Sequence, residues 1–141
     1  MKTQLKLKIL NVDNQGYHIF VKAKMNGKSA NLLLDTGASK TVFDANRIGK
    51  FAEQSSMKVN DHKSTGLGTN SMQSHTIVIK KLSLGELQIK NYELFLLDLS
   101  HVNETYEKLN YKALDGVIGG DILMQYKAQI NYKNKTLKLF F

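Results

Sequence analysis

The chain has 141 residues, of which 42% are hydrophobic and 23% are charged, a composition typical of one folded domain that can bury a core. The absence of cysteine excludes disulfides, thiolate nucleophiles and cysteine-ligated zinc sites. The apolar runs are far shorter than the ~20 residues of a membrane-spanning helix, and the N-terminal MKTQLKLKIL lacks the apolar stretch of a signal peptide. We therefore expect a single domain over residues 1–141, cytoplasmic and without a membrane partner.

Alternating apolar and polar residues, separated by turn signals such as Asn26-Gly27, predict a chain made mostly of short strands. The expected strands, in chain order, cover residues 5–12, 17–25, 28–34, 57–59, 76–84, 87–99, 128–132 and 136–141. Three short helices are expected between them, over residues 44–51, over residues 103–109 with Asn103 as the cap, and over a segment that ends near Tyr126.

The net charge is +8, from 20 basic and 12 acidic residues. Most lysines alternate with apolar residues, as in QLKLKIL and FVKAKM, and this alternation places lysine on the solvent face of a strand. Exposed strand faces are therefore the favoured interpretation of the charge. An acidic or nucleic-acid partner stays as the alternative, with nucleic acid the less expected because no interleaved aromatic residues accompany the lysines.

Six of the ten glycines fall in three short segments, which indicates places where the backbone bends or approaches a neighbour closely. These segments are DTGAS with Gly37, a loop with Gly66 and Gly68, and DGVIGGD with Gly116, Gly119 and Gly120. Because these glycines cluster outside simple hairpin turns, they suggest a functional site.

Asp35 directly follows three leucines, so its carboxylate is expected at the rim of the core. The hydroxyls of Thr36 and Ser39 and the amide of Gly37 are local hydrogen-bond partners for it. Taken alone, Asp-Thr-Gly is more often an ordinary turn in which the carboxylate bonds to nearby amides, and the three leucines before it and the ASxTV pattern after it favour a site.

Two segments together resemble a known family. LLLDTGASKTVF resembles the active-site strand and loop of retropepsin-like aspartic proteases, and GVIGGDIL resembles the segment of that family that passes beside this loop and leads into a short C-terminal helix. The resemblance implies a mostly β, closed retropepsin-like barrel with a flap hairpin. The site residues that it implies are catalytic Asp35, the supporting loop residues Thr36, Gly37, Ala38 and Ser39, the flap residues Gly66, Leu67 and Gly68, and Val117, Ile118 and Gly119 beside the loop.

Only one DTG is present, whereas the family needs two facing aspartates, so the resemblance implies a symmetric homodimer with one Asp35 from each subunit. It implies an aspartic endopeptidase that acts on a peptide or protein substrate through water activated between the two carboxylates, without cofactor or metal. Thr36 resembles the residue whose hydroxyl bonds across the two-fold axis.

The chain departs from the retroviral pattern in lacking an acidic residue at Ser39 and an arginine at Gly120, which form an ion pair in many retroviral members. A catalytically inactive retropepsin-like module that binds or dimerises therefore stays as an alternative function. A basic β-barrel that binds nucleic acid is a third possibility, motivated only by the charge.

Other candidates for chemistry are weaker. His18, His62, His75 and His101 lack the spacing of a zinc motif and are expected to be surface or packing residues. Asp115 is interpreted as a turn residue, and Asp121 as the start of a helix. The apolar terminal strands either interleave between two subunits or pair within one chain, and the sequence favours neither arrangement.

Overall fold

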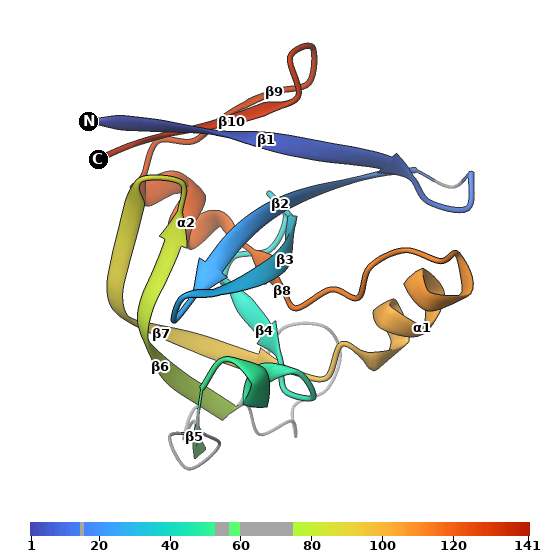
Figure 1. Cartoon of the computed structure of the whole chain (residues 1–141), viewed down its shortest axis with the longest axis horizontal. Coiled ribbons are helices and arrows are strands. Elements are labelled where there is room, and N and C mark those ends of the chain that lie inside the picture. The colour runs from blue at the N-terminus through green and yellow to red at the C-terminus, as the bar shows by residue number, and fades with distance from the viewer. Residues whose placement is uncertain (15, 53–56, 60–74) are drawn as a thin grey trace.

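A computed structural model of the chain describes residues 1–14, 16–52, 57–59 and 75–141 (Figure 1). Its strands are β1 (Lys2–Asn11), β2 (Tyr17–Met25), β3 (Lys28–Leu34), β4 (Val42–Asp44), β5 (Met57–Val59), β6 (His75–Leu84), β7 (Leu87–Leu97), β8 (Gly116–Ile118), β9 (Gln129–Asn131) and β10 (Thr136–Phe140). Its helices are the short 3-10 helix η1 (Ile48–Lys50), α1 (Ser100–Lys108) and α2 (Gly120–Gln125).

Six strands close into a barrel. They are hydrogen-bonded in the order β6, β7, β4, β8, β3 and β2, and β2 pairs back onto β6 through Lys24–Ser83 and Met25–Leu82. Outside this ring, β1, β10 and β9 continue the sheet from β2, and β5 pairs with β6. The prediction of a mostly β closed barrel with a short C-terminal helix is confirmed.

The barrel interior is filled by leucine and isoleucine side chains that alternate with polar ones along the strands. On β6 and β7, for example, Ile79, Leu82 and Leu94 are completely buried. On β1, Leu5 and Leu7 are buried while Lys6 is exposed. Removing apolar area from water is the main stabilising term for such a core. Because side chains alternate along a strand, burial of the apolar ones places the lysines on the solvent face, as predicted.

Helix α1 covers a second, smaller apolar cluster outside the barrel. Tyr106 is buried against Phe20 with ring centroids 5.5 Å apart, and Leu114 and Val117 complete the contact. The Tyr106 hydroxyl lies 2.7 Å from His18 Nδ1, so His18 is a packing residue, as expected. Burial raises the pKa of the Tyr106 phenol to about 12.

The prediction that Asn103 caps a helix is wrong, because α1 begins at Ser100 and Asn103 lies within it. The Asn103 amide instead accepts from Leu114 N at 2.6 Å and donates to Leu114 O at 3.0 Å. It also donates to Asp44 Oδ2 at 3.1 Å. The residue therefore fastens α1 to the barrel, which is a tertiary role that a local capping pattern does not reveal.

The predicted helix over residues 44–51 is also wrong in part. Asp44 belongs to β4, pairs with Leu97 of β7 and is 2% exposed, and only Ile48–Lys50 forms a single 3-10 turn. The buried Asp44 carboxylate accepts hydrogen bonds from the backbone amides of Asn46 and Leu99 at 3.0 and 3.3 Å. Pairing with β7 thus overrides the local helix signal. The strand predicted to reach residue 99 ends at Leu97.

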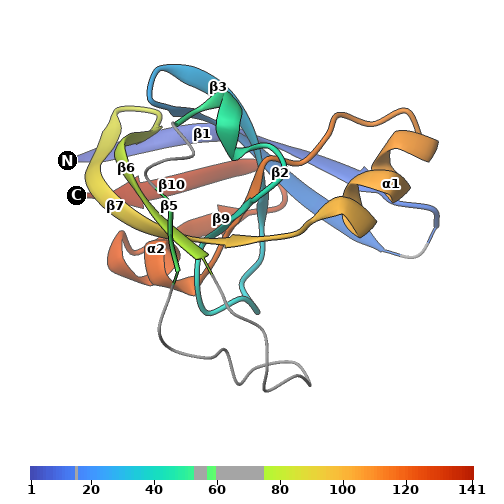
Figure 2. The same ribbon diagram turned by 90° about the horizontal axis from the view of Figure 1, so that it is seen from below.

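The two terminal strands pair with each other inside one chain. β1 and β10 run antiparallel from Lys2–Phe140 to Lys6–Thr136. Figures 1 and 2 show the two ends of the chain side by side. The Met1 amine donates to Phe141 O, and Phe141 N donates to Met1 O at 2.8 Å. Within-chain pairing is therefore the observed arrangement of the two that the sequence left open.

No helix in the described part of the chain has the length and apolar character to cross a membrane.

Candidate active site

Asp35 is the first residue after the buried strand β3. Its amide donates to Ile118 O at 3.0 Å, which continues the parallel pairing of β3 with β8 by one residue. Its carboxylate leaves the barrel at this point and is exposed, and Oδ1 accepts from Gly37 N at 2.9 Å. The chain thus presents one carboxylate to solvent from a rigid strand end.

The two sequence segments that resemble the family lie against each other. β8 is placed between β3 and β4, with Val117 paired to Leu33 on one side and to Val42 on the other. The loop over residues 35–41 joins β3 to β4 at the end of β8. The structure therefore brings Val117, Ile118 and Gly119 beside the candidate loop, where the sequence predicts them.

Gly119 is glycine because the loop backbone presses against it. A Cβ atom there would lie 2.7 Å from the carbonyl group of Lys40 and 2.8 Å from Ala38 O. At Gly120 the same atom would meet Ala38 O at an ordinary 3.5 Å. Gly120 N donates to Ala38 O at 2.7 Å. Loop and α2 are thus in direct backbone contact.

Asp121 holds the far end of the loop. Its carboxylate accepts from Thr41 Oγ1 at 2.7 Å, from Thr41 N at 3.0 Å and from Tyr92 Oη at 2.7 Å. Thr41 Oγ1 in turn accepts from Gly119 N at 3.1 Å. The expectation that Asp121 starts a helix is correct, since α2 begins at Gly120, but it misses this second role.

The electrostatics of this cluster follow from its hydrogen bonds. Partial burial by itself would raise the pKa of Asp121, but the donors from Thr41, Tyr92 and Ile122 outweigh it and hold that pKa below its ordinary value. Burial first, and then donation to the Asp121 carboxylate, raises the pKa of the Tyr92 phenol well above its ordinary value. Asp121 is therefore an ionised anchor for the loop at neutral pH.

The remaining expected loop residues are solvent-accessible. Thr36 and Ser39 are exposed and Ala38 is half-buried. A Cβ on Gly37 would lie 3.3 Å from Asp35 Oδ1, which is a tight contact. Ser39 and Gly120 carry no charge and cannot form the ion pair of the retroviral pattern, and Gly120 N instead donates to Ala38 O. The predicted flap residues Gly66, Leu67 and Gly68 lie outside the described residues.

Asp115 is not the simple turn residue that the sequence suggests. It is 5% exposed, accepts from Arg47 Nε at 2.6 Å, and accepts from Asn31 N at 2.8 Å. The ion pair connects the start of β8 to the turn after β4, and the hydrogen bond from Asn31 N connects it to β3. One feature of the sequence indicates this ion pair: Arg47 is the only arginine in a chain rich in lysine, and a guanidinium suits a buried, directional ion pair.

A closed barrel with one aspartate at the end of an inner strand, beside a hydrophobic–hydrophobic–glycine segment, is the retropepsin-like aspartic protease fold. A crystal structure of a retropepsin-like aspartic protease from Rickettsia conorii superposes with a TM-score of 0.59 at 14% identity, over 99% of this chain and 88% of that one. The retroviral protease-like domain of Ddi1 from Leishmania major gives 0.59 at 15% identity, over 85% of this chain and 86% of that one. The EIAV protease, solved with the inhibitor HBY-793, gives 0.52 at 17% identity, over 84% of this chain and 96% of that one.

Residues 21–122, more than half of the chain, match the aspartyl protease family model, so the chain belongs to this family. No curated protein matches it by sequence.

Proposed function

We propose that the protein is a homodimeric aspartic endopeptidase in which each subunit contributes one Asp35, with residues 1–141 acting as one domain. The observation that carries the proposal is the exposed Asp35 carboxylate at the end of β3, in a loop anchored by Gly119 and Asp121. One carboxylate is half of the catalytic pair that this chemistry needs, and a two-fold axis beside Asp35 supplies the other.

In the proposed dimer, two carboxylates about 3 Å apart share one proton, because both cannot ionise at that distance without a large cost. The ionised carboxylate takes a proton from a bound water, and the protonated one donates to the carbonyl oxygen of the peptide bond. The water oxygen attacks the carbonyl carbon without a covalent enzyme intermediate. The C–N bond of the resulting tetrahedral species then breaks as the nitrogen takes up the proton that the carboxylate removed from water. In this proposal the Thr36 hydroxyls bond across the axis, and the loop with Gly66, Leu67 and Gly68 closes over the peptide.

The test compares Asp35→Asn with Asp13→Asn. Both replace an exposed aspartate, and Asp13 lies in a turn at φ 53°, a backbone conformation that asparagine accepts. We expect Asp35→Asn to abolish cleavage of a peptide library while the fold and the dimer mass stay unchanged, and Asp13→Asn to keep full activity. The wild-type enzyme should show a bell-shaped pH–rate profile that reports the pair. Full cleavage by Asp35→Asn would refute the proposal.

One observation weighs against a required dimer and so favours the alternative of an inactive retropepsin-like module that binds a partner without cleaving it. β1 and β10 pair within the chain, so these strands already have partners and need no second subunit to complete their ladder. Sedimentation equilibrium at high micromolar concentration, together with the peptide library, separates the two functions. A monomer without turnover supports the module, and a dimer with turnover that depends on Asp35 supports the endopeptidase.

A further inference from the structure

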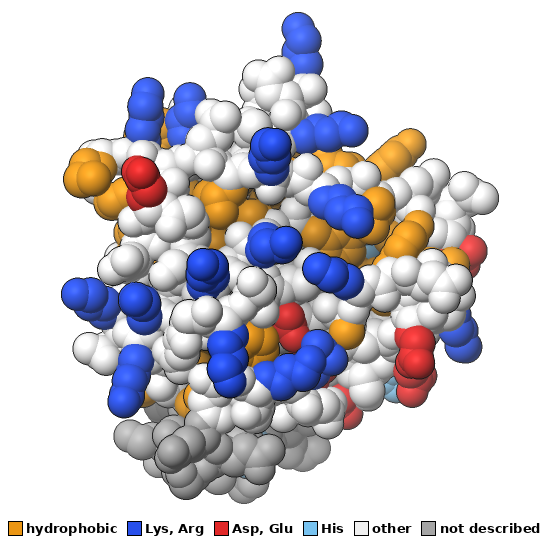
Figure 3. Space-filling view, in the orientation of Figure 1, with side chains coloured by type: hydrophobic (Ala, Val, Ile, Leu, Met, Phe, Trp, Pro, Cys, Tyr) orange, Lys and Arg blue, Asp and Glu red, His pale blue; other side chains and the backbone are white. Residues whose placement is uncertain are grey.

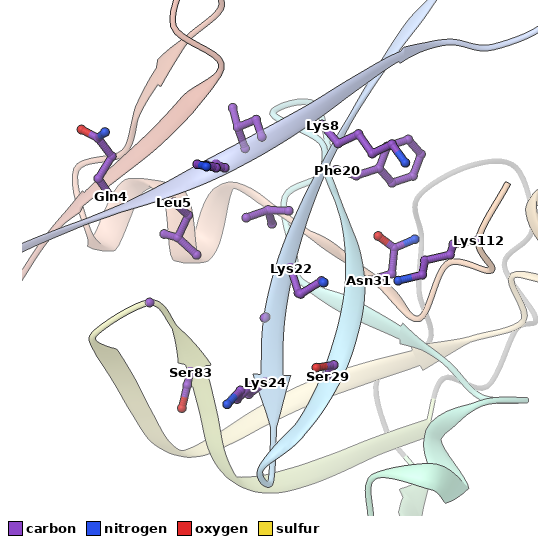
Figure 4. A pocket seen from close by; sticks show the side chains of 15 residues that line it. Gln4, Leu5, Lys8, Phe20, Lys22, Lys24, Ser29, Asn31, Ser83 and Lys112 are labelled. Atoms are coloured by element: carbon purple, nitrogen blue, oxygen red, sulfur yellow. The ribbon is translucent and has the colours of Figure 1, made fainter.

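A groove opens where β1 and β2 separate. The two strands pair only between Leu7–Val21 and Asn11–Tyr17, and beyond this point the first half of β1 turns away to pair with β10. The far end of the groove is bounded by the β6–β7 turn, where Glu86 N donates to Thr3 Oγ1 at 3.0 Å. The groove encloses about 780 Å³, and Figure 4 shows its lining. None of residues 35–39 lines it, so it is separate from the candidate active site.

The groove has an apolar floor and basic walls. Buried Leu5, Leu7 and Val21 lie along the floor. The walls carry the exposed lysines Lys6, Lys8, Lys22, Lys24 and Lys112. The 15 lining residues include no aspartate and no glutamate. Figure 3 shows lysine side chains spread over this face with apolar atoms between them.

Among the residues that the structure describes, these lysines form no ion pair. In the described part of the chain the one ion pair joins Arg47 to Asp115. Like charges on facing walls repel one another, and an anion that enters between them removes that repulsion and gains attraction to several ammonium groups together. Their mutual repulsion is not offset by an ion pair within the described part of the chain, which leaves the groove suited to an anionic ligand.

The geometry favours an extended acidic polypeptide. Lys6 and Lys8 on β1, and Lys22 and Lys24 on β2, follow each other at every second residue, which is about 6.6–6.8 Å along a strand. An extended segment with a carboxylate at every second residue has the same repeat.

Two other occupants fit less well. Single-stranded nucleic acid binds by stacking bases on exposed aromatic rings, but the one aromatic residue of the groove, Phe20, is 5% exposed and packs against Tyr106. A second copy of this chain would bring lysine against lysine if the same face met itself. We therefore propose that the groove between β1 and β2 binds an acidic, extended segment of a polypeptide partner, at a site distinct from Asp35.

The test uses the whole protein and three labelled probes: the decapeptide (Glu-Thr)5, its neutral counterpart (Gln-Thr)5 and a ten-nucleotide oligothymidylate. Fluorescence anisotropy measures binding at low salt. The groove variant is Lys8→Gln with Lys22→Gln, and the matched control is Lys90→Gln with Lys133→Gln, two exposed lysines outside the groove. Both variants lose two positive charges, and because all four side chains are exposed we expect both to fold.

We expect (Glu-Thr)5 to bind and (Gln-Thr)5 not to bind. The groove variant should lose about tenfold in affinity for (Glu-Thr)5, because each exposed ion pair contributes up to ~1 kcal/mol. The affinity of the control variant should change less than about threefold. Binding should weaken as salt is added. An equal loss in both variants would mean attraction to net charge alone and would overturn the proposal. Absence of peptide binding at low salt, or tighter groove-dependent binding of the oligonucleotide, would overturn it as well. Each outcome is independent of peptide cleavage, so it does not depend on the proposed activity.

Discussion

At the scale of single residues, the position of Asp35 is fixed by contacts with residues far along the chain. Thr41 and Asp121, which close the end of the loop, are 80 positions apart. The backbone of Gly119 touches the carbonyls of the same loop. Substitutions that are remote from Asp35 in sequence should therefore change the geometry of the candidate site.

Gly119 and Gly120 give a matched test of this dependence. Gly119→Ala would force a Cβ to within 2.8 Å of backbone atoms on the loop, whereas Gly120→Ala would place it at an ordinary 3.5 Å. We expect Gly119→Ala to lower the free energy of unfolding by about 1–3 kcal/mol and Gly120→Ala to change it by less than about 0.5 kcal/mol. Urea denaturation measures both. Equal effects of the two substitutions would contradict the close contact at Gly119.

Asp121 should make stability depend on pH. The pKa of Asp121 in the folded state is held below its ordinary value, so as the pH falls the unfolded chain takes up the proton first. The stabilisation is therefore present above the ordinary aspartate pKa of 3.8 and is lost as the pH falls through the folded-state pKa. Asp121→Asn keeps one acceptor oxygen but turns an amide donor either toward both Thr41 N and Tyr92 Oη or toward both Thr41 Oγ1 and Ile122 N. We expect it to cost about 1–3 kcal/mol at pH 7 and to flatten the loss of stability as the pH falls through and below the ordinary aspartate pKa.

A double-mutant cycle with Tyr92→Phe isolates the phenol contact. Tyr92→Phe alone should cost about 1 kcal/mol, the net worth of one hydrogen bond. Combined with Asp121→Asn it should cost less than the sum of the two single substitutions, because the partners share one contact. Strict additivity would show that the 2.7 Å bond between Tyr92 Oη and Asp121 carries no energy.

The sequence predicts contacts between residues that are close in the chain better than contacts between residues that are far apart in the chain. Asp35 and the segments on both of its sides follow from the pattern LLLDTGAS and from the second motif. The partners Tyr92 and Arg47 do not, because their hydrogen bonds join residues 29 and 68 positions away. No spacing rule for a strand or helix connects such positions.

At the scale of elements, β8 and α1 define how the candidate site is supported. β8 is only three residues long, yet it pairs with β3 on one side and β4 on the other and is buried throughout. α1 is attached from outside, through the Tyr106 cluster and through Asn103. The site loop thus rests on a central strand, whereas α1 is an added layer.

The attachment of α1 is tested by Asn103→Ala, with Thr105→Ala as control on the same helix. Asn103 makes three hydrogen bonds, to Leu114 O, from Leu114 N and to Asp44. Its loss leaves buried Asp44 with one donor fewer, so we expect a cost of about 2–3 kcal/mol. Thr105 is exposed, and among the described residues its hydroxyl bonds only to His101 O, at 3.3 Å within the helix, so its substitution should cost less than about 0.5 kcal/mol. Thermal unfolding followed by circular dichroism measures both, and similar costs would contradict the docking role.

Local signals explain why the strands and hairpins were predictable. Asn26 and Gly27 have φ values of 50° and 84°, the left-handed pair that a tight hairpin needs, and the sequence marks them directly. The segment after residue 42 was mispredicted because Asp44 looks like a helix cap, while pairing with β7 and burial make it part of a strand. Element type therefore follows from the sequence where turn residues dominate, and fails where a distant strand decides.

At the scale of the whole molecule, the first and last strands of the chain, β1 and β10, pair with each other. Leu137 and Leu139 of β10 are completely buried, and β10 pairs with β1 on one side and β9 on the other. The terminal strands are therefore part of the structural framework of one chain.

Deleting Phe140 and Phe141 tests this pairing. The deletion removes the bonds from Phe140 N to Tyr126 O and from Phe141 N to Met1 O, both 2.8 Å. We expect a loss of about 1–3 kcal/mol in the free energy of unfolding that is the same at low and high protein concentration. Sedimentation equilibrium should find the dimer dissociation constant unchanged. A weaker dimer with unaltered monomer stability would instead mean that the termini exchange between subunits.

The central place of β8 also has a kinetic consequence. Its backbone amides at residues 116–118 are enclosed between two neighbouring strands, so solvent deuterium reaches them only when the barrel opens as a whole. Their exchange rate should equal the rate set by global unfolding, whereas amides at the exposed β9–β10 turn exchange within far shorter times. The hydrogen-exchange rate of these three amides therefore reports on the stability of the strand that supports the Asp35 loop.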